Sequence, residues 1–228
     1  MMNYASDFVI RSMEDLSGAV ETLGIVPFFK NRIPGFSLEE HVDPRLWFSD
    51  EPGPWEWKGP VIHSTHCAYG KFSDGKAVYV SRKLFLELAN YRRDGYDFDA
   101  RFDDGLASFK DRELYELLSE KAPVLSGDLK KDGDYLKGGK KGFETIVTRL
   151  QSQCYVLIND FVYMKDRFGK TYGWGVAEYS TPEKFFGASF RKNVYKKEPE
   201  ESYEILLKKL KKLVPYAAEE ELQRFLKR

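Results

Sequence analysis

The chain has 228 residues, of which 42% are hydrophobic, so it is long enough to bury the core of one or two domains. Its 36 basic and 36 acidic residues cancel, so the total charge does not by itself indicate a polyanion-binding protein. The charge is unevenly spread: residues 1–60 hold ten acidic and five basic residues (net −5), whereas residues 128–228 hold fifteen acidic and twenty-one basic residues (net +6). A polyanion would therefore bind the C-terminal half.

Cysteine, histidine and apolar patterns exclude several classes of protein. The two cysteines, Cys67 and Cys154, lie outside any Cys-x-x-Cys pattern, so we expect neither a disulfide framework nor a zinc site. His63 and His66 form a close pair in a stretch expected to be loop, but further ligands are missing, so we predict no metal and no cofactor. No signal peptide and no apolar run of roughly 20 residues is present. We expect a soluble, cytoplasmic protein that does not contact a membrane.

Residues 1–107 are predicted to be a small α/β portion. An apolar face over residues 12–23, followed by Gly24, predicts a first helix, and residues 37–41 offer a short second one. The prolines and glycines of residues 51–60 are expected to exclude a long regular element. The Asp-Gly step within residues 68–81 predicts a β-hairpin.

The next residues predict a helix and then a polar loop. Ser81 is expected to cap a helix that runs to Ala89. Residues 90–105 form the densest polar stretch of the chain, and they also carry several aromatic residues. Because free linkers rarely carry so many aromatics, we expect an ordered loop there.

Residues 108–187 predict the order helix, helix, helix, strand, turn, strand. The first helix ends before Pro123, and Ser126 is expected to cap a brief second helix. Residues 143–150 carry apolar side chains at i, i+3, i+4 and i+7, which predicts an amphipathic third helix. Strand-forming residues flank a turn within residues 154–179. This order is typical of a winged-helix domain.

In a winged helix, the polar third helix enters the DNA major groove and the wing touches the backbone or the minor groove. The candidate contacts with double-stranded DNA are therefore Lys140, Lys141, Thr145, Thr148, Arg149, Lys165, Arg167 and Lys170. The alternative is that these are ordinary solvated side chains, and that the domain packs against a partner or the rest of the chain. The excess positive charge of the C-terminal half favours DNA.

Three segments of this domain carry a family pattern. They are Arg112-Glu113-Leu114-Tyr115-Glu116-Leu117-Leu118 through Leu125-Ser126-Gly127-Asp128-Leu129, Lys141-Gly142-Phe143 through Thr148-Arg149-Leu150-Gln151, and Tyr179-Ser180-Thr181-Pro182-Glu183. The pattern resembles the winged-helix proteins related to the AlkZ and YcaQ DNA glycosylases, in a short bacterial branch. The resemblance covers roughly the C-terminal two thirds of the chain, and the further signatures of that branch would be residues 54–60 and 90–105. The resemblance implies ancestry among enzymes that remove alkylated or crosslinked bases.

The chain departs from the glycosylases of that family in length and in its catalytic motif. Those enzymes carry tandem winged helices, a β-barrel and a Gln-x-Gln or Gln-x-Asp motif in a loop well before this region. Here Gln151-Ser152-Gln153 lies at the end of the predicted third helix. We therefore assign no catalytic role to Gln151 or Gln153, and the sequence leaves open whether the chain is an enzyme.

The polar loop offers candidates for chemistry. Asp97 and Asp99 are candidate catalytic residues, because a carboxylate can position water or stabilise the positive charge that develops during glycosidic cleavage. Aromatic and cationic side chains that could hold an extruded base form the candidate pocket. These are Trp55, Trp57, Tyr91, Arg92, Arg93, Tyr96 and Arg101. The alternative is that the arginines pair with the aspartates to hold a loop, while the aromatics fill a core.

Residues 188–228 predict two amphipathic helices separated by Pro215. The expected fold is thus α+β: a small N-terminal α/β portion (1–107), a winged helix (108–187) and a C-terminal helical tail (188–228). We predict a DNA-binding protein. Action on damaged DNA is a further hypothesis. The alternatives are a non-enzymatic regulator or protein-interaction module, and a small-molecule binder that uses the aromatic pocket. The sequence does not fix the oligomeric state.

Overall fold

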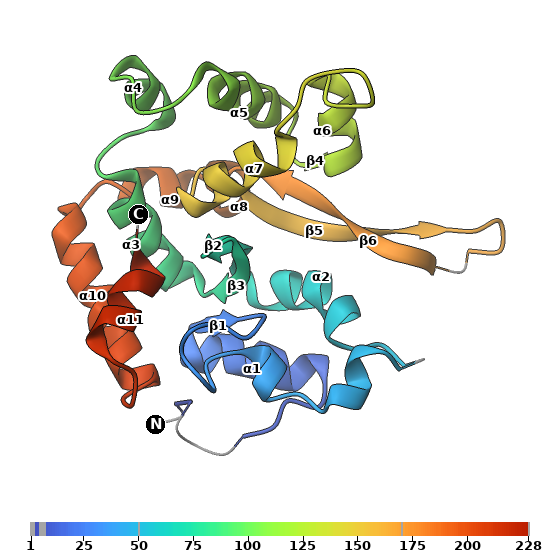
Figure 1. Cartoon of the computed structure of the whole chain (residues 1–228), viewed down its shortest axis with the longest axis vertical. Coiled ribbons are helices and arrows are strands. Elements are labelled where there is room, and N and C mark those ends of the chain that lie inside the picture. The colour runs from blue at the N-terminus through green and yellow to red at the C-terminus, as the bar shows by residue number, and fades with distance from the viewer. Residues whose placement is uncertain (1–2, 5–7, 50, 170, 228) are drawn as a thin grey trace.

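The computed structural model describes residues 3–4, 8–49, 51–169 and 171–227, the side chains of residues 171 and 172 excepted. Within these residues, the strands form one six-stranded antiparallel sheet in the order β1-β3-β2-β5-β6-β4 (Figure 1). The strands are β1 (Ile25–Pro27), β2 (Ala68–Ser73), β3 (Lys76–Val80), β4 (Val124–Leu125), β5 (Leu157–Lys165) and β6 (Thr171–Ser180). Together with the helices, the sheet confirms the α+β class.

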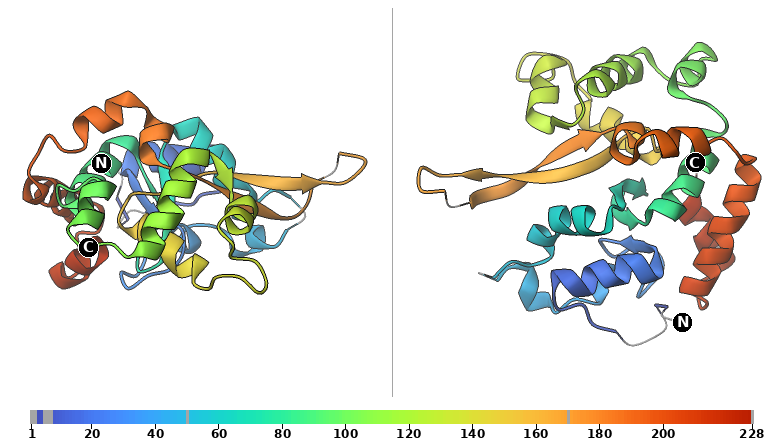
Figure 2. Two further views of the ribbon diagram at one scale, coloured as in Figure 1. Left: turned by 90° about the horizontal axis from the view of Figure 1, so that it is seen from above. Right: turned by 180° about the vertical axis from the view of Figure 1, so that it is seen from behind.

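Helices before, between and after the strands complete the described fold (Figures 1 and 2). The N-terminal ones are α1 (Met13–Leu23), the 3-10 turns η1 (Leu38–Glu40) and η2 (Pro44–Trp47), and α2 (Pro54–Thr65). The central ones are α3 (Arg82–Arg93), α4 (Phe98–Asp103), α5 (Phe109–Lys121), α6 (Ser126–Asp132) and α7 (Phe143–Ser152). The last are α8 (Pro182–Phe186), α9 (Ala188–Asn193), α10 (Pro199–Leu213) and α11 (Glu219–Leu226).

The first helix and the first hairpin form as the sequence predicts. Ser12 caps α1 by accepting a hydrogen bond from the Asp15 backbone N–H, and Gly24 ends the helix in the left-handed conformation, with φ of 79°. Asp74 and Gly75 both have positive φ, 47° and 69°, as a tight two-residue hairpin turn requires. The short helix expected at residues 37–41 is the 3-10 turn η1.

Helix α2 contradicts the expectation that residues 51–60 hold no long regular element. Pro54 occupies the first turn, where its missing N–H costs no hydrogen bond. Pro60 lies inside the helix, on its exposed side, and the burial of Trp57, Val61 and Ile62 offsets the lost backbone bond. His63, expected in a loop, therefore lies in the last turn of this helix.

The polar stretch of residues 90–105 is not only a loop. Helix α3 continues to Arg93, four residues beyond the predicted end at Ala89, and α4 follows after a short turn. Asp97 caps α4 by accepting a hydrogen bond from the Ala100 backbone N–H at 2.9 Å. Local capping by this aspartate was the signal for a helix in this polar sequence.

Residues 108–187 adopt the element order α5, β4, α6, α7, β5, β6, followed by the short α8. Strand β4 pairs with the end of β6, where Val124 lies opposite Tyr179. Strands β5 and β6 form a long hairpin, called the arm below, which projects beyond the rest of the molecule in Figures 1 and 2. The predicted apolar face of α7 is buried, at Phe143, Ile146, Val147 and Leu150.

The sheet crosses the predicted boundary at residues 107 and 108. Tyr69 of β2 pairs with Ile158 of β5, which joins the first three strands to the last three. Helix α7 also contacts β2, and α10 packs along α3. The N-terminal portion, the central unit and the C-terminal helices therefore share packed contacts.

Candidate nucleic-acid interface

Helix α7 is held to its neighbours on part of its polar face. Thr145 is exposed, whereas Thr148 is half-buried and accepts a hydrogen bond from Lys71 Nζ at 3.3 Å. Arg149 Nε donates to Asp111 Oδ1 at 3.0 Å, and the Nη2 of Arg149 donates to the same oxygen. The arginine expected to reach DNA is therefore bonded to a carboxylate of α5.

The acceptor Asp111 is an almost completely buried carboxylate, 4% exposed. The backbone N–H and the hydroxyl of Ser108 also donate to it, at 2.9 and 2.7 Å. Burial raises the pKa of Asp111, but the hydrogen bonds from Arg149 and Ser108 outweigh it and hold this pKa below the ordinary value. Asp111 thus stays charged and fixes Arg149 against α5.

The end of α6 and the loop that leads from it to α7 are rich in lysine. Residues 130–142 hold five lysines and two aspartates. Lys140 pairs with Glu113 at 2.9 Å. Lys141 is exposed, as is Lys137, and no carboxylate of the described residues lies within ion-pair distance of either. These two side chains are free to meet an anion.

The arm carries charged and aromatic side chains into solvent. Lys165 and Arg167 are exposed near its tip, whereas the predicted contact Lys170 lies outside the described residues. The Arg167 guanidinium lies 4.6 Å from the Phe168 ring, and this ring is 78% exposed. An exposed ring beside an unpaired cation is a surface that can contact a nucleic acid or another protein.

A groove of about 690 Å³ runs beside α7, between this helix, the turn after β2 and α11. Thr145, Thr148 and Arg149 line one side of it. Arg224 and Lys227 of the C-terminal end line the other. The C-terminal helix thus brings basic residues close to α7, although nearly 80 residues separate them in sequence.

The residues of the predicted pocket are not brought together. Trp55 and Trp57 lie on α2, whereas Tyr91, Arg92 and Arg93 end α3, on the other side of the molecule in Figure 1. Trp57 is 6% exposed and donates from Nε1 to the Pro52 carbonyl at 3.0 Å. Trp57 therefore belongs to the core.

Arg92 and Arg93 are buried, at 3% and 1% exposure. Arg92 donates to the carbonyls of Ser152 and Phe225 at 2.8 and 3.3 Å. Arg93 donates to the Cys154 carbonyl from two nitrogens, at 3.2 and 2.7 Å, and pairs with Glu183 at 2.6 Å. Both arginines tie α3 to distant parts of the chain and face no open cavity. Their partners are not the aspartates that follow them in sequence.

The remaining residues of that stretch lie on α3 (Tyr91), in the turn before α4 (Tyr96) and on α4 (Arg101). The backbone carbonyl of Tyr96 accepts hydrogen bonds from Tyr155 and Tyr195, at 2.8 and 2.9 Å. Arg101 is half-buried, and its Nε has no hydrogen-bond partner among the described residues. Tyr91 packs against Tyr203 with 5.0 Å between ring centroids. The candidate catalytic residues Asp97 and Asp99 are both exposed on α4.

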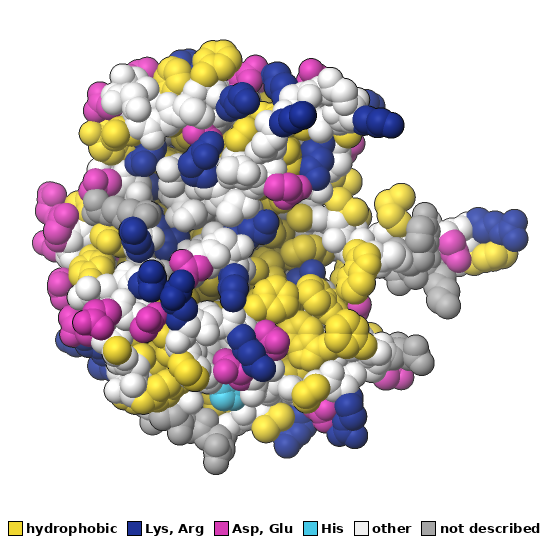
Figure 3. All heavy atoms as spheres, viewed as in Figure 1, with side chains coloured by type: hydrophobic (Ala, Val, Ile, Leu, Met, Phe, Trp, Pro, Cys, Tyr) yellow, Lys and Arg dark blue, Asp and Glu magenta, His cyan; other side chains and the backbone are white. Residues whose placement is uncertain are grey.

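A cluster of aromatic rings that the sequence did not predict surrounds Trp55. Its members are Phe28, Phe29, Trp47 and Trp174, whose ring centroids lie between 5.5 and 5.7 Å from that of Trp55 in each pair that involves it. Trp174 comes from the arm and is 70% exposed. Figure 3 shows hydrophobic side chains gathered between the arm and the α2 region. The alternation of aromatic residues in β6 gave no sign that they would meet α2.

Lys58 lies among these rings. Its Nζ is 3.9 Å from the Phe161 centroid and 5.0 Å from that of Trp55, and the residue is 9% exposed. No carboxylate of the described residues pairs with it. Burial lowers the pKa of Lys58 to about 8, against a smaller opposing effect of Glu56. The Lys58 ammonium thus lies over two ring faces, which attract a cation.

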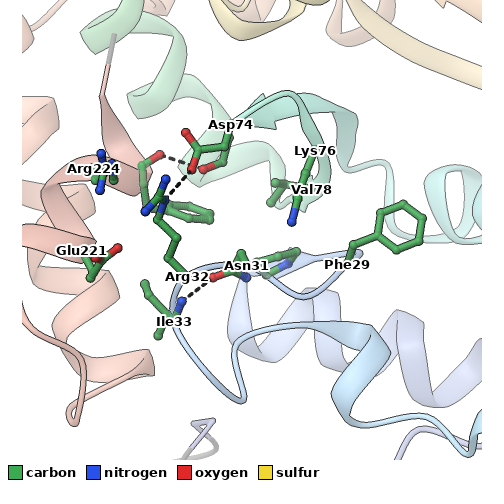
Figure 4. A pocket seen from close by; sticks show the side chains of 12 residues that line it. Phe29, Asn31, Arg32, Ile33, Asp74, Lys76, Val78, Glu221 and Arg224 are labelled. Atoms are coloured by element: carbon green, nitrogen blue, oxygen red, sulfur yellow. Dashed lines mark hydrogen bonds and ion pairs between the residues drawn. The ribbon is translucent and has the colours of Figure 1, made fainter.

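A second cavity, of about 400 Å³, lies between the loop after β1, the turn after β2 and α11 (Figure 4). Arg32, Asp74 and Arg224 are among its polar residues, and Phe29 and Val78 are among its apolar ones. Asp74 and Arg224 also line the groove beside α7, so the two cavities adjoin. Sequence spacing gave no signal for this site, because its walls come from three distant segments.

Gln151, the first residue of the Gln-x-Gln pattern, is fully buried. Its Oε1 accepts a hydrogen bond from the Lys71 backbone N–H at 2.9 Å, and its Nε2 donates to the Val147 carbonyl at 3.3 Å. Both ends of the amide are thus bonded inside the protein. Gln151 links α7 to β2 and cannot reach a DNA strand.

Metal-ligating residues do not cluster within the described part of the chain, where no group of three or more histidine, cysteine or acidic side chains could hold an ion. His63 Nε2 lies 3.1 Å from Asp160 Oδ2, and His66 stacks on Phe185. The two histidines thus have different partners. None of the described helices is long and apolar enough to cross a membrane.

The sequence profile of the AlkZ-related family matches residues 10–227, which is nearly the whole chain. The chain belongs to the AlkZ-related family. Searches of curated proteins and of solved structures gave no significant match. The family match confirms the resemblance and extends it from roughly the C-terminal two thirds of the chain to nearly the whole of it.

Proposed function

We propose that residues 108–187 of this AlkZ-related protein form a winged helix that binds double-stranded DNA. The observation that carries the proposal is the strand pairing within residues 108–187. Helix α5 is followed by β4, the helices α6 and α7, and the arm, and β4 pairs with β6. In a winged helix, this arrangement sets the third helix beside a two-stranded wing.

Exposed basic side chains support this proposal at both ends of the proposed DNA-binding surface, which extends from the loop before α7 to the tip of the arm. Lys137 and Lys141 lie in the loop that leads into α7, and Lys165 and Arg167 lie near the tip of the arm. In Figure 1, this loop and the arm extend toward the same side of the molecule. Four cations without an ion-pair partner among the described residues suit, on such a surface, the phosphates of a duplex.

The contacts of α7 define what kind of recognition is proposed. Arg149 is bonded to Asp111, and Thr148 is bonded to Lys71, so both are withdrawn from base edges. Thr145 and Lys141 are exposed at the start of the helix. We therefore infer that backbone contacts dominate, which gives strong salt dependence and little sequence preference.

The proposal stops at binding. Family membership suggests a relative of DNA glycosylases, but Gln151 is buried, and Asp97 serves as a helix cap. Action on damaged DNA stays a hypothesis, which release of a modified base from alkylated duplex would test. Loss of release on changing Asp97 or Asp99 to Asn would assign them a role, and no release from any tested lesion would leave binding alone.

Fluorescence anisotropy with a labelled duplex of about 20 base pairs, roughly two helical turns, tests the binding proposal. We expect the double variant Lys137→Glu, Lys141→Glu to weaken binding at least tenfold at low salt. It should also reduce the slope of log affinity against log salt by about 2, because each phosphate contact contributes roughly 0.9. Lys165→Glu, Arg167→Glu should behave in the same way.

A matched control changes the same charge elsewhere. Lys208 and Lys212 are exposed on α10, away from the arm in Figure 1, so Lys208→Glu, Lys212→Glu should leave affinity and slope nearly unchanged. Equal weakening by the control and the test variants would mean that only total charge matters, and it would contradict the proposed surface. Absence of salt-sensitive binding by the unaltered protein would remove the proposal altogether.

A further inference from the structure

The cavity of Figure 4 is lined by two arginines, of which Arg224 has no side-chain partner among the described residues and Arg32 has only a long ion pair. The Arg224 side chain is exposed on α11 and makes no hydrogen bond or ion pair with the described residues. The Arg32 Nε lies 3.7 Å from Asp74 Oδ2, which is an ion pair but is longer than a hydrogen bond. Figure 4 shows Arg32 rising from the loop after β1, opposite Arg224. Two guanidinium groups on either side of one cavity suit a phosphate group.

The same cavity holds an acceptor that lacks a donor. The Oε2 atom of Glu221, one turn before Arg224 on α11, is buried and has no hydrogen-bond partner among the described residues. Leaving such an atom unpaired is costly, so an unsatisfied buried acceptor beside an open cavity points to a donor supplied by a ligand. Amide and amino N–H groups of a nucleobase are donors of this kind.

The apolar walls complete the chemistry. Phe29 and Phe225 line the cavity together with Ile33 and Val78. Aromatic and branched side chains of this kind can hold a flat ring by stacking and by burial of its faces. A volume of about 400 Å³ falls within the range of small-ligand sites, roughly 300–1,000 Å³. A ligand that fits must therefore combine an anion, an N–H donor and a flat ring.

We propose that this cavity binds a nucleotide, with its phosphate between Arg32 and Arg224 and an N–H group of its base on Glu221. The nucleotide is either a free mononucleotide or one unit of an unpaired strand. A strand would enter along the groove beside α7, which shares Asp74, Arg224 and Phe225 with the cavity. None of the residues that line the cavity is among the proposed duplex contacts Lys137, Lys141, Lys165 and Arg167, so the inference does not depend on the proposed winged helix.

Calorimetric titration of the full chain with each deoxynucleoside monophosphate, and with inorganic phosphate alone, tests the first source. We expect at least one mononucleotide to bind, and to bind more tightly than phosphate because phosphate lacks the base. Arg224→Ala should weaken that binding at least tenfold. Glu221→Gln should change the ranking among the bases more than it changes phosphate binding.

Anisotropy with labelled oligodeoxynucleotides of a few bases, without a complementary strand, tests the second source. Binding of these oligonucleotides but not of mononucleotides, lost in Arg224→Ala, assigns the cavity to a strand. Binding of both mononucleotides and oligonucleotides, lost in Arg224→Ala, shows that the cavity accepts a nucleotide from either source. The control is Arg191→Ala, which removes an exposed arginine of α9, outside the residues that line the cavity, and should change neither titration.

Two results would overturn the inference. One is the absence of binding in both titrations with a protein shown to be folded by circular dichroism. The other is binding that survives Arg224→Ala, Arg32→Ala and Glu221→Gln unchanged. Either result leaves the duplex experiment unaffected, because the Lys137, Lys141, Lys165 and Arg167 variants lie outside this cavity.

Discussion

Arg92 and Arg93 at the end of α3 and Arg224 at the cavity of Figure 4 lie in opposite environments. The guanidinium of Arg93 donates to the Cys154 carbonyl, the Glu183 carboxylate and the Tyr195 hydroxyl, and the residue is 1% exposed. Arg224 is exposed and makes no polar contact with the described residues. Lys58 is intermediate, because it is buried and lies over two ring faces but has no carboxylate partner among the described residues.

The comparison separates cations that stabilise the fold from cations that are available to a ligand. A polar stretch rich in arginine, residues 90–105, looked like the better site in the sequence. In the structure, Arg92 and Arg93 of this stretch are bonded to internal partners, whereas Arg224, whose side chain has no partner among the described residues, lies in an ordinary amphipathic helix. Bonding within the fold, and not charge density along the chain, decides which side chains can bind a partner.

The largest expected effect in this comparison is on Arg93. Arg93→Met should lower the free energy of unfolding by about 3–5 kcal/mol, because it leaves the Glu183 carboxylate without its buried partner and the Cys154 carbonyl without its donors. Urea unfolding followed by circular dichroism measures the change. Arg191→Met, at an exposed position, is the matched control and should stay within about 0.5 kcal/mol of the unaltered protein. If Arg93→Met lowered the free energy of unfolding no more than Arg191→Met does, Arg93 would behave as an ordinary surface residue and the prediction would be wrong.

A smaller effect is expected from Lys58, and it depends on pH. Its pKa is about 8 in the folded chain, whereas an unfolded lysine keeps its proton to a pH of about 10.4. Between these values, the unfolded state binds more protons, so stability rises with pH. Its contribution should be nearly absent at pH 7 and reach about 2 kcal/mol near pH 9.5, from about 1.36 kcal/mol per pKa unit.

Urea unfolding of the unaltered protein and of Lys58→Met at these two pH values isolates that contribution. The stability difference between the two proteins should shift by about 2 kcal/mol in favour of the unaltered one as the pH rises. Lys208→Met removes an exposed lysine and should show no such shift. Parallel pH profiles for the unaltered protein and Lys58→Met would show that the pKa of Lys58 is not lowered.

The smallest effect on stability is expected for Arg224. Arg224→Ala should change the free energy of unfolding by less than about 0.5 kcal/mol, because the side chain has no internal partner to lose. The same variant should abolish most nucleotide binding. A loss of stability above about 1 kcal/mol would show that Arg224 supports the fold, and it would remove the contrast with Arg93.

The helices and strands were largely predictable because their signals are local. Ser12 and Gly24 mark the ends of α1, the Asp-Gly step marks the first hairpin, and the apolar spacing of residues 143–150 marks α7. Helix α2 is not predictable from local signals, because Pro60 disfavours a helix whereas the burial of Trp57, Val61 and Ile62 stabilises it. Tertiary packing overrides propensity at such positions.

The candidate sites were less predictable because they depend on long-range contacts. The exposure of Lys165 and Arg167 follows from a hairpin turn, which the sequence shows. The bond between Arg149 and Asp111 spans 38 residues, and the cavity joins Arg32 to Arg224 across most of the chain. No spacing rule relates such positions, so the sequence alone predicts the wrong partners for these side chains or predicts no partners.

The single pairing of Tyr69 with Ile158 has a practical consequence for preparing this protein. Cutting the chain at residue 107 would separate β2 from β5 and leave an exposed edge strand on each piece. Exposed edge strands pair readily with other chains and lead to aggregates. Expression of residues 108–187 alone is therefore a poor route to a crystal or a binding assay, and the intact chain is the right starting material for both.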